Sequence, residues 1–211
     1  MLDYNYWLLF ISAAVALNVA PGPDVLYIVT KTISGGKRIG VASMLGICTG
    51  ALFHVVVAAI GLSAILMTSA VAFTVVKYTG ACYLLYLAYQ SFRSSGASFE
   101  IDNELEVTQS ALKAFKEGIL IDVLNPKVAI FFLAFLPQFV REGYGSTSIQ
   151  LFYLGIAVIF IALIIETIYI LLASSVSEKI RNSTAISVWL DRMVGTVFLL
   201  LGLKLASSAN T

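Results

Sequence analysis

The sequence predicts an all-α polytopic membrane protein with six transmembrane helices. Hydrophobic residues make up 59% of its 211 residues and charged residues only 12%, against roughly 25% charged residues in ordinary soluble domains. The run from Ile39 to Val76 contains no Asp, Glu, Lys or Arg. Apolar stretches of about 20 residues, the length of a spanning helix, recur along the whole chain. A water-soluble surface cannot be built from so few charges, so the bilayer must be the solvent.

Charged and polar interruptions divide the apolar sequence into the predicted spans. The charge-free run is too long for one span, which predicts a helical hairpin with a tight turn near residues 67–70. The six predicted spans are Tyr6–Thr30, Val41–Leu66, Val71–Phe92, Ala114–Val140, Ile149–Leu172 and Val188–Ala206.

The loops share the positive charge unequally, and this predicts the orientation in the membrane. Nine Lys and Arg residues follow the first, third and fifth helices, and three lie on the opposite side. Because cytoplasmic loops carry the excess of Lys and Arg, both termini are predicted outside the cytoplasm. The nine are Lys31, Lys37, Arg38, Arg93, Lys113, Lys116, Lys179, Arg181 and Arg192, and the three are Lys77, Arg141 and Lys204.

The chain divides into two predicted halves of three helices each. Residues 1–92 form the first three-helix repeat, residues 93–113 a cytoplasmic connector, and residues 114–211 the second repeat. With three helices per half, the two halves must enter the membrane from opposite sides. This is the inverted-repeat plan of many secondary transporters, in which the substrate lies between broken helices near the middle of the bilayer.

Proline interrupts the first and the fourth predicted helices in mid-span. The motifs are Pro21-Gly22-Pro23-Asp24 and Asn125-Pro126-Lys127. Proline frees backbone polar groups, which hydrocarbon does not tolerate unless protein or water covers them. Pro23 and Asp24 read as the first positions of a new half-helix, and Asn125 as an N-cap followed by proline. The N-termini of the half-helices would then face a carboxylate ligand between them, whereas the alternative is a harmless kink in each helix.

Five ionisable side chains lie within the predicted spans, where burying a charge is costly and therefore indicates function. They are Asp24, His54, Asp122, Lys127 and Glu166. The three carboxylates fall at similar predicted depth, where they could bind a substrate ammonium or exchange protons. Three alternatives stay open: Asp24 stabilises a helix N-terminus, Glu166 reaches the membrane interface, and Asp122 pairs with Lys127.

Small residues form a stripe at i, i+4 spacing in the second predicted helix. The stripe runs through Ala42, Gly46, Gly50, His54 and Ala58. Glycine and alanine at this spacing let another helix approach closely, which permits either internal packing or a homodimer. A histidine on such a stripe is more often a packed hydrogen-bonding side chain than a proton relay.

Other functional classes fit the sequence less well. A net charge of +1 and the lack of a basic arm disfavour nucleic-acid binding. The single histidine excludes a multi-histidine metal centre, and no Walker, GxGxxG or HExxH pattern occurs, so neither a metal, a cofactor nor an enzymatic activity is expected. The alternative of another class is a membrane thiol oxidoreductase that uses Cys48 and Cys82. Buried small hydrophobic residues are the commoner reading of such cysteines.

Several motifs, in their order and spacing, resemble the LysE/RhtB family of amino-acid exporters over essentially the whole chain. They are Pro21–Asp24, the run Gly46–His54, Tyr83–Leu87, Asn125–Phe132, Leu136–Phe139 and the acidic residue Glu166.

The resemblance implies a protein of the bacterial cytoplasmic (inner) membrane that exports amino acids or close derivatives and is energised by the proton gradient. Family members act on lysine, arginine, threonine, homoserine, leucine and cysteine, so the resemblance does not identify the cargo. Residue by residue, the family's motifs correspond here to Pro21, Gly22, Pro23, Asp24, Asn125, Pro126, Lys127 and Glu166.

These expectations combine into an exporter of a small zwitterion that works by alternating access. The substrate carboxylate is expected at the half-helix N-termini near residues 22–24 and 125–127, and its ammonium at Asp24 or Glu166. Protonation of the same carboxylate from outside would then displace the substrate, which makes the transporter a proton antiporter.

Overall fold

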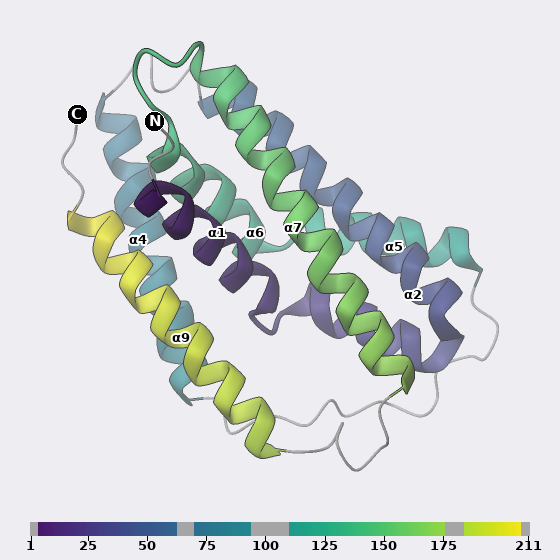
Figure 1. The fold of residues 1–211 in the computed structure, drawn as a ribbon. Helices are drawn as coiled ribbons and strands as arrows, with labels where there is room; N and C mark the ends of the chain where they lie inside the picture. The colour runs from purple at the N-terminus through teal and green to yellow at the C-terminus, as the bar shows by residue number, and fades with distance from the viewer. Residues whose placement is uncertain (1–3, 63–69, 94–109, 176–183, 208–211) are drawn as a thin grey trace.

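A computed structural model describes residues 4–62, 70–93, 110–175 and 184–207, and within them all regular structure is helical (Figure 1). The predicted connector and the predicted turn at residues 67–70 lie mostly outside these ranges. The elements are α1 (Tyr4–Val19), α2 (Pro23–Val57), the π-helical turn η1 (Ala58–Leu62), α4 (Ala70–Arg93), α5 (Ala111–Val123), α6 (Pro126–Ile130), the π-helical turn η2 (Phe131–Phe135), the 3₁₀ turn η3 (Leu136–Phe139), α7 (Thr147–Ser175) and α9 (Thr184–Ser207).

Length and apolar composition identify the helices that can cross a membrane. Among the described residues, two helices qualify, Pro23–Gly61 and Thr147–Ser174. A third span is formed if Ala111–Val123 and Pro126–Phe139, which meet at a bend of 50°, count as one. The all-helical class is thus confirmed, and two or three candidate spans among the described residues are consistent with a multi-pass membrane protein.

The breaks lie where the prolines predicted them, and a further break separates the first two predicted spans. The helix that begins at Pro23 passes Thr30 and ends at Gly36, where φ is 77° and the backbone is not helical, and a second helical segment continues to Val57, so the predicted end lies a few residues too early. Glycine adopts this left-handed conformation without a steric penalty. Lys31 and Lys77, which were assigned to loops, lie inside helices with exposed fractions of 7% and 2%, so they do not report on orientation as loop charges do.

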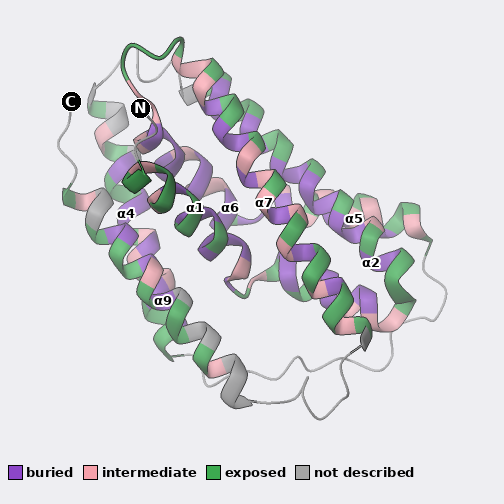
Figure 2. Ribbon diagram, in the orientation of Figure 1, coloured by how far each residue is buried: buried purple, intermediate pink, exposed green. Residues whose placement is uncertain are grey.

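The helices form two groups with the broken segments between them (Figure 1). On one side α4 lies along α9, and on the other α2 packs against both α5 and α7. Phenylalanines from α1, η2 and η3 fill the space between the groups, including Phe10, Phe131, Phe135 and Phe139. Exposed residues lie on the outward faces of the helices (Figure 2), and many of them are large and apolar, as expected where lipid is the solvent.

The small-residue stripe of α2 packs internally against α5. A Cβ added at Gly50 would lie 2.6 Å from Cβ of Asp122, and one added at Gly46 would overlap the carbonyl oxygen of Phe115. From the facing helix, a Cβ at Gly118 would lie 2.7 Å from the carbonyl oxygen of Ser43. The stripe therefore gives no argument for a homodimer, because α5 already covers it.

We expect Gly118→Ala to destabilise the protein by about 1–3 kcal/mol, because backbone atoms cannot yield to the added methyl group. Thermal unfolding in detergent measures the effect. Gly61→Ala is the matched control, since a Cβ there meets nothing within 4 Å. Equal melting temperatures for the two variants would show that α2 and α5 are not packed this closely.

Candidate functional site

Each proline motif starts a new helical segment, as the sequence predicted. After α1 ends at Val19, Gly22 has extended backbone angles and α2 begins with Pro23. In the fourth predicted span, the Asn125 side chain accepts a hydrogen bond of 3.1 Å from the backbone N–H of Lys127, and α6 begins at Pro126. The prolines themselves are exposed, so the residues that follow them form the contacts between the two breaks.

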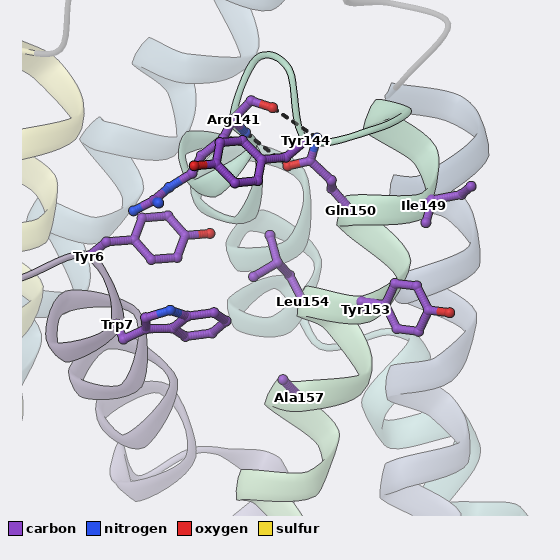
Figure 3. Close-up of a pocket in the computed structure, with 9 residues that line it drawn as sticks. All are labelled: Tyr6, Trp7, Arg141, Tyr144, Ile149, Gln150, Tyr153, Leu154 and Ala157. Atoms are coloured by element: carbon purple, nitrogen blue, oxygen red, sulfur yellow. Dashed lines mark hydrogen bonds between the residues drawn. The ribbon is translucent and has the colours of Figure 1, made fainter. Parts of the chain in front are cut away.

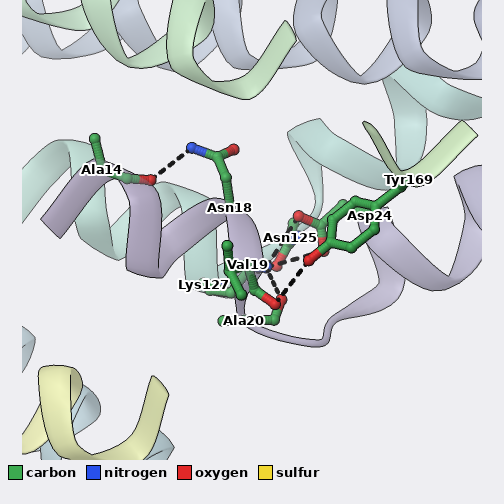
Figure 4. Close-up of polar contacts among 8 residues, drawn as sticks. All are labelled: Ala14, Asn18, Val19, Ala20, Asp24, Asn125, Lys127 and Tyr169. Carbon is green, nitrogen blue, oxygen red and sulfur yellow. Dashed lines mark hydrogen bonds and ion pairs between the residues drawn. The ribbon is translucent and has the colours of Figure 1, made fainter. Parts of the chain in front are cut away.

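A buried ion pair joins the two breaks (Figure 4). The Lys127 ammonium lies 3.0 and 2.9 Å from the two carboxylate oxygens of Asp24, and it donates a third hydrogen bond of 3.0 Å to the carbonyl oxygen of Ala20. Asp24 is 4% exposed and Lys127 is 5% exposed. The three bonds use all three N–H donors of the ammonium. The alternative in which Lys127 pairs with Asp122 is therefore wrong. The bend between α5 and α6 directs the Lys127 side chain to the break between α1 and α2.

Glycine is needed between the two partners. A Cβ at Gly22 would lie 2.6 Å from Asp24 Oδ1 and 2.9 Å from Lys127 Nζ. A side chain there would have to displace the ion pair. Gly22 is thus required for the close approach of Asp24 and Lys127, in addition to its place in the break between α1 and α2.

Two further side chains stabilise the end of α1, and the sequence reading missed both (Figure 4). The hydroxyl of Tyr169 donates to the carbonyl oxygen of Val19 at 3.2 Å, and the Asn18 amide donates to the carbonyl oxygen of Ala14 at 2.7 Å. Tyr169 lies three residues after Glu166, a spacing that places both on one face of α7. That spacing was the signal available in the sequence.

The three carboxylates predicted to share a layer line one small cavity. Asp24, Asp122 and Glu166 contribute to a space of about 20 Å³, which is enough for about one water molecule. Glu166 is 2% exposed, so the alternative in which it reaches the interface is wrong. The thiol of Cys48 donates to Glu166 Oε2 at 3.5 Å.

Two buried polar atoms beside the break between α5 and α6 have no hydrogen-bond partner among the described residues: Oδ2 of Asp122 and Nδ2 of Asn125. Asp122 and Asn125 are each 1% exposed. Buried polar atoms are rarely left unpaired, because doing so costs about 1–3 kcal/mol for each. Unpaired polar atoms beside a break in a helix are typical of a site that is completed by a proton, water or ligand.

A larger cavity lies on the other side of the ion pair. It has a volume of about 200 Å³, far more than one water requires, and is large enough for a small amino acid. Its walls come from the break between α1 and α2, from α4, from the start of α6 and from α9. The lining residues are Ala20, Pro21, Leu87, Gln90, Ser91, Lys127 and Phe198. The carboxylate of the ion pair thus lines the small acidic cavity, and its ammonium lines the larger one.

His54 is a packed residue, as its place on the stripe indicated. It is 5% exposed, its Nε2 lies 3.1 Å from the carbonyl oxygen of Asp122, and its ring stacks on Phe132 at 6.1 Å. These contacts hold α2 against Asp122, which precedes the break between α5 and α6, and against Phe132, which follows it.

A polar cluster that the sequence reading missed joins α2 to α5 one turn beyond Asp24. The hydroxyl of Tyr27 lies 2.8 Å from the carbonyl oxygen of Ala114 and 2.9 Å from Glu117 Oε2, and Lys31 pairs with the same oxygen at 3.2 Å. The partners are about 90 residues apart in sequence, so local spacing gave no sign of them.

Both cysteines have free thiols. The reading as a buried small residue is correct for Cys48 and wrong for Cys82, which is exposed on α4. The described residues contain no feature that favours thiol chemistry over the ionic site.

Comparison with known proteins identifies the family. The model for LysE type translocators matches residues 15–209. The chain belongs to the LysE type translocator family. A homoserine/homoserine lactone efflux protein of Salmonella typhimurium is 31% identical over 210 residues, which cover 99% of this chain and 100% of that protein. An uncharacterized membrane protein of Vibrio cholerae is 30% identical over 98% of this chain and 99% of its own length. No solved structure matches this LysE type translocator. Membership places the chain in a family of membrane transport proteins, and relatives of this family are named for efflux.

Proposed function

We propose that this translocator exports a small amino acid or a close derivative by proton antiport. The observation that carries the proposal is the buried pair of Asp24 and Lys127, which joins two broken helices between two cavities. The relatives named for efflux of homoserine and its lactone favour a substrate of that size.

The ion pair carries the same two charges as a zwitterion. An amino acid that enters the 200 Å³ cavity beside Lys127 places its carboxylate on the lysine and its ammonium on Asp24. One buried ion pair is thereby replaced by two, so no charge is left uncompensated in either state. This matters because removing one partner of a buried pair costs about 3–5 kcal/mol. In the empty transporter Asp24 and Lys127 neutralise one another.

Protonation of Asp24 couples export of the substrate to entry of the proton. A proton that reaches Asp24 from outside neutralises the carboxylate, removes the partner of the substrate ammonium and releases the substrate outward. The proton leaves to the cytoplasm when the empty site turns inward, so one amino acid moves out as one proton moves in. Asp122 and Glu166, which line the acidic cavity together with Asp24, are the groups that relay the proton.

Alternating access requires two bodies that move against each other around a fixed site. We propose that these are residues 1–92 and 114–211, as inverted repeats of three spans each, in a bacterial inner membrane with both termini outside. The contact between the first and fourth broken helices then lies where the two repeats meet. The protein works in this scheme as a monomer or as a homodimer, because each chain contains a complete site.

Efflux from reconstituted vesicles tests the proposal. Vesicles loaded with labelled homoserine are diluted into acidic buffer, and the wild type is expected to release label faster than without a pH gradient. Asp24→Asn should abolish this acceleration, because the amide cannot take up the proton, and thermal unfolding is measured beside it to confirm that the variant, which leaves Lys127 without its partner, is still folded. Glu142→Gln, at an exposed acidic residue, is the control and should retain it. Normal gradient-driven efflux by Asp24→Asn would remove Asp24 from the mechanism.

A further inference from the structure

A third cavity, which shares no lining residue with the other two, lies between the start of α1 and the start of α7 (Figure 3). It has a volume of about 420 Å³. Its polar groups gather at one end, where Arg141, Tyr144 and Gln150 lie together, and Leu154 and Ala157 form the apolar part further along α7 (Figure 3). The cavity is thus amphipathic along its length.

The cationic end is built to hold the guanidinium in place. Gln150 fixes the backbone of Arg141 twice, by accepting from its N–H at 2.9 Å and donating to its carbonyl oxygen at 2.9 Å. The guanidinium stacks on the Tyr6 ring at 3.6 Å from the ring centroid, and the Tyr6 hydroxyl donates to the carbonyl oxygen of Phe139 at 2.6 Å. The stack covers one face of the guanidinium, and its N–H donors lie in its plane, in the fork that matches an oxyanion.

The apolar end opens toward the lipid. Trp7, Ile149 and Tyr153 line the cavity with exposed fractions of 38%, 58% and 69%. In a membrane protein, exposed apolar side chains face acyl chains, and tryptophan and tyrosine gather at the level of the headgroups. The cavity therefore combines a cation at headgroup level with an apolar wall that continues into the hydrocarbon.

We propose that this cavity binds an anionic phospholipid. The phosphate pairs with the Arg141 guanidinium, and the upper acyl chain lies against Trp7, Leu154 and Ala157. A guanidinium fork binds phosphate through two parallel hydrogen bonds. A free amino acid would fill only the polar end and leave the apolar wall uncovered, which favours a lipid. The site shares no residue with the proposed transport site and does not depend on it.

Fluorescence quenching by brominated lipid tests the proposal, because Trp7 lies in the cavity wall. The chain has two tryptophans, so Trp189→Phe leaves Trp7 as the only one. The full-length variant is reconstituted in vesicles of phosphatidylcholine and phosphatidylglycerol, with bromine on the upper acyl chain of one lipid or the other. Quenching at equal lipid fractions is expected to show about fivefold enrichment of phosphatidylglycerol beside Trp7, the size expected for one basic side chain at an anionic surface.

Arg141→Gln should reduce the enrichment to none, while both lipids still quench Trp7, which shows that the helix remains in the bilayer. Arg93→Gln is the matched control, because Arg93 also lies over a tyrosine, at 5.6 Å from the Tyr89 ring centroid, but is not among the residues that line this cavity. It should keep the enrichment. Equal quenching by both lipids in the parent variant, or an enrichment that survives Arg141→Gln, would overturn the proposal. Loss of enrichment on adding millimolar inorganic phosphate or homoserine would also overturn it, by assigning the site to a soluble anion.

Discussion

Replacing Lys127 by methionine is expected to destabilise the protein by about 3–5 kcal/mol, because Asp24 would remain buried without its partner. Efflux should be lost in the same variant. Methionine matches the four-atom stem of lysine and keeps that space filled, so loss of the charged ammonium is the main change. Thermal unfolding in detergent and efflux from vesicles measure the two effects. Lys116→Met removes an exposed lysine of α5 and should change neither quantity appreciably.

The double variant Asp24→Asn with Lys127→Met separates stability from transport. With both charges removed, no uncompensated charge remains, and replacement of a whole buried pair is often neutral for stability. We expect most of the lost stability to return while efflux stays absent, since the zwitterion then has no partner for either charge. An unaltered melting temperature in the single variant would contradict the ion pair, and efflux by the double variant would contradict its role in transport.

Filling the cavity beside Lys127 should block transport without unfolding the protein. Ser91 and Leu87 line this cavity from α4, so Ser91→Leu and Leu87→Trp place extra atoms where the substrate is proposed to bind. We expect efflux to fall at least about tenfold in both, equivalent to ~1.4 kcal/mol of lost binding. Labelled homoserine efflux and thermal unfolding measure the two properties together.

Cys82→Leu is the control for cavity filling, because it adds the same side chain to an exposed position of the same helix. Ser91→Ala, which keeps the cavity open, should transport at nearly the wild-type rate. If Ser91→Leu and Leu87→Trp both fold and export normally, the substrate does not use the cavity on this side of the ion pair.

Helix positions that depend on local chemistry were predictable from the sequence. The third predicted span, Val71–Phe92, differs from α4 by one residue at each end. The starts of α2 and α6 follow from proline and the Asn125 cap, which act within one turn. The end of the first span was predicted a few residues before the break at Gly36, because Lys31 was taken as a loop charge. Its partner Glu117 lies on another helix, and a buried charge is tolerated in a helix once such a partner is present.

The candidate site was predictable in its members and not in its pairing. Asp24, Asp122, Lys127 and Glu166 were found because a charge in hydrocarbon is costly enough to require a reason. Local spacing offered Asp122 as the partner of Lys127, whereas Lys127 pairs with Asp24, 103 residues away. The bend between α5 and α6 decides which of the two carboxylates Lys127 reaches, and no rule based on local sequence gives the direction of that bend. The two cavities depend on how side chains from several helices pack, which the sequence alone does not show.

The central claim is that a proton and a zwitterion compete for Asp24, and the pH dependence of substrate binding tests it most directly. Labelled homoserine is bound to purified protein at a series of pH values, with Glu166→Gln and Asp122→Asn measured in parallel. In the wild type the dissociation constant should rise as the pH falls, approaching about tenfold per pH unit for one competing proton, and Asp24→Asn should bind weakly with no such dependence. If Asp24→Asn retains the wild-type pH dependence, the proton and the substrate do not share this carboxylate, and the proposed mechanism is contradicted.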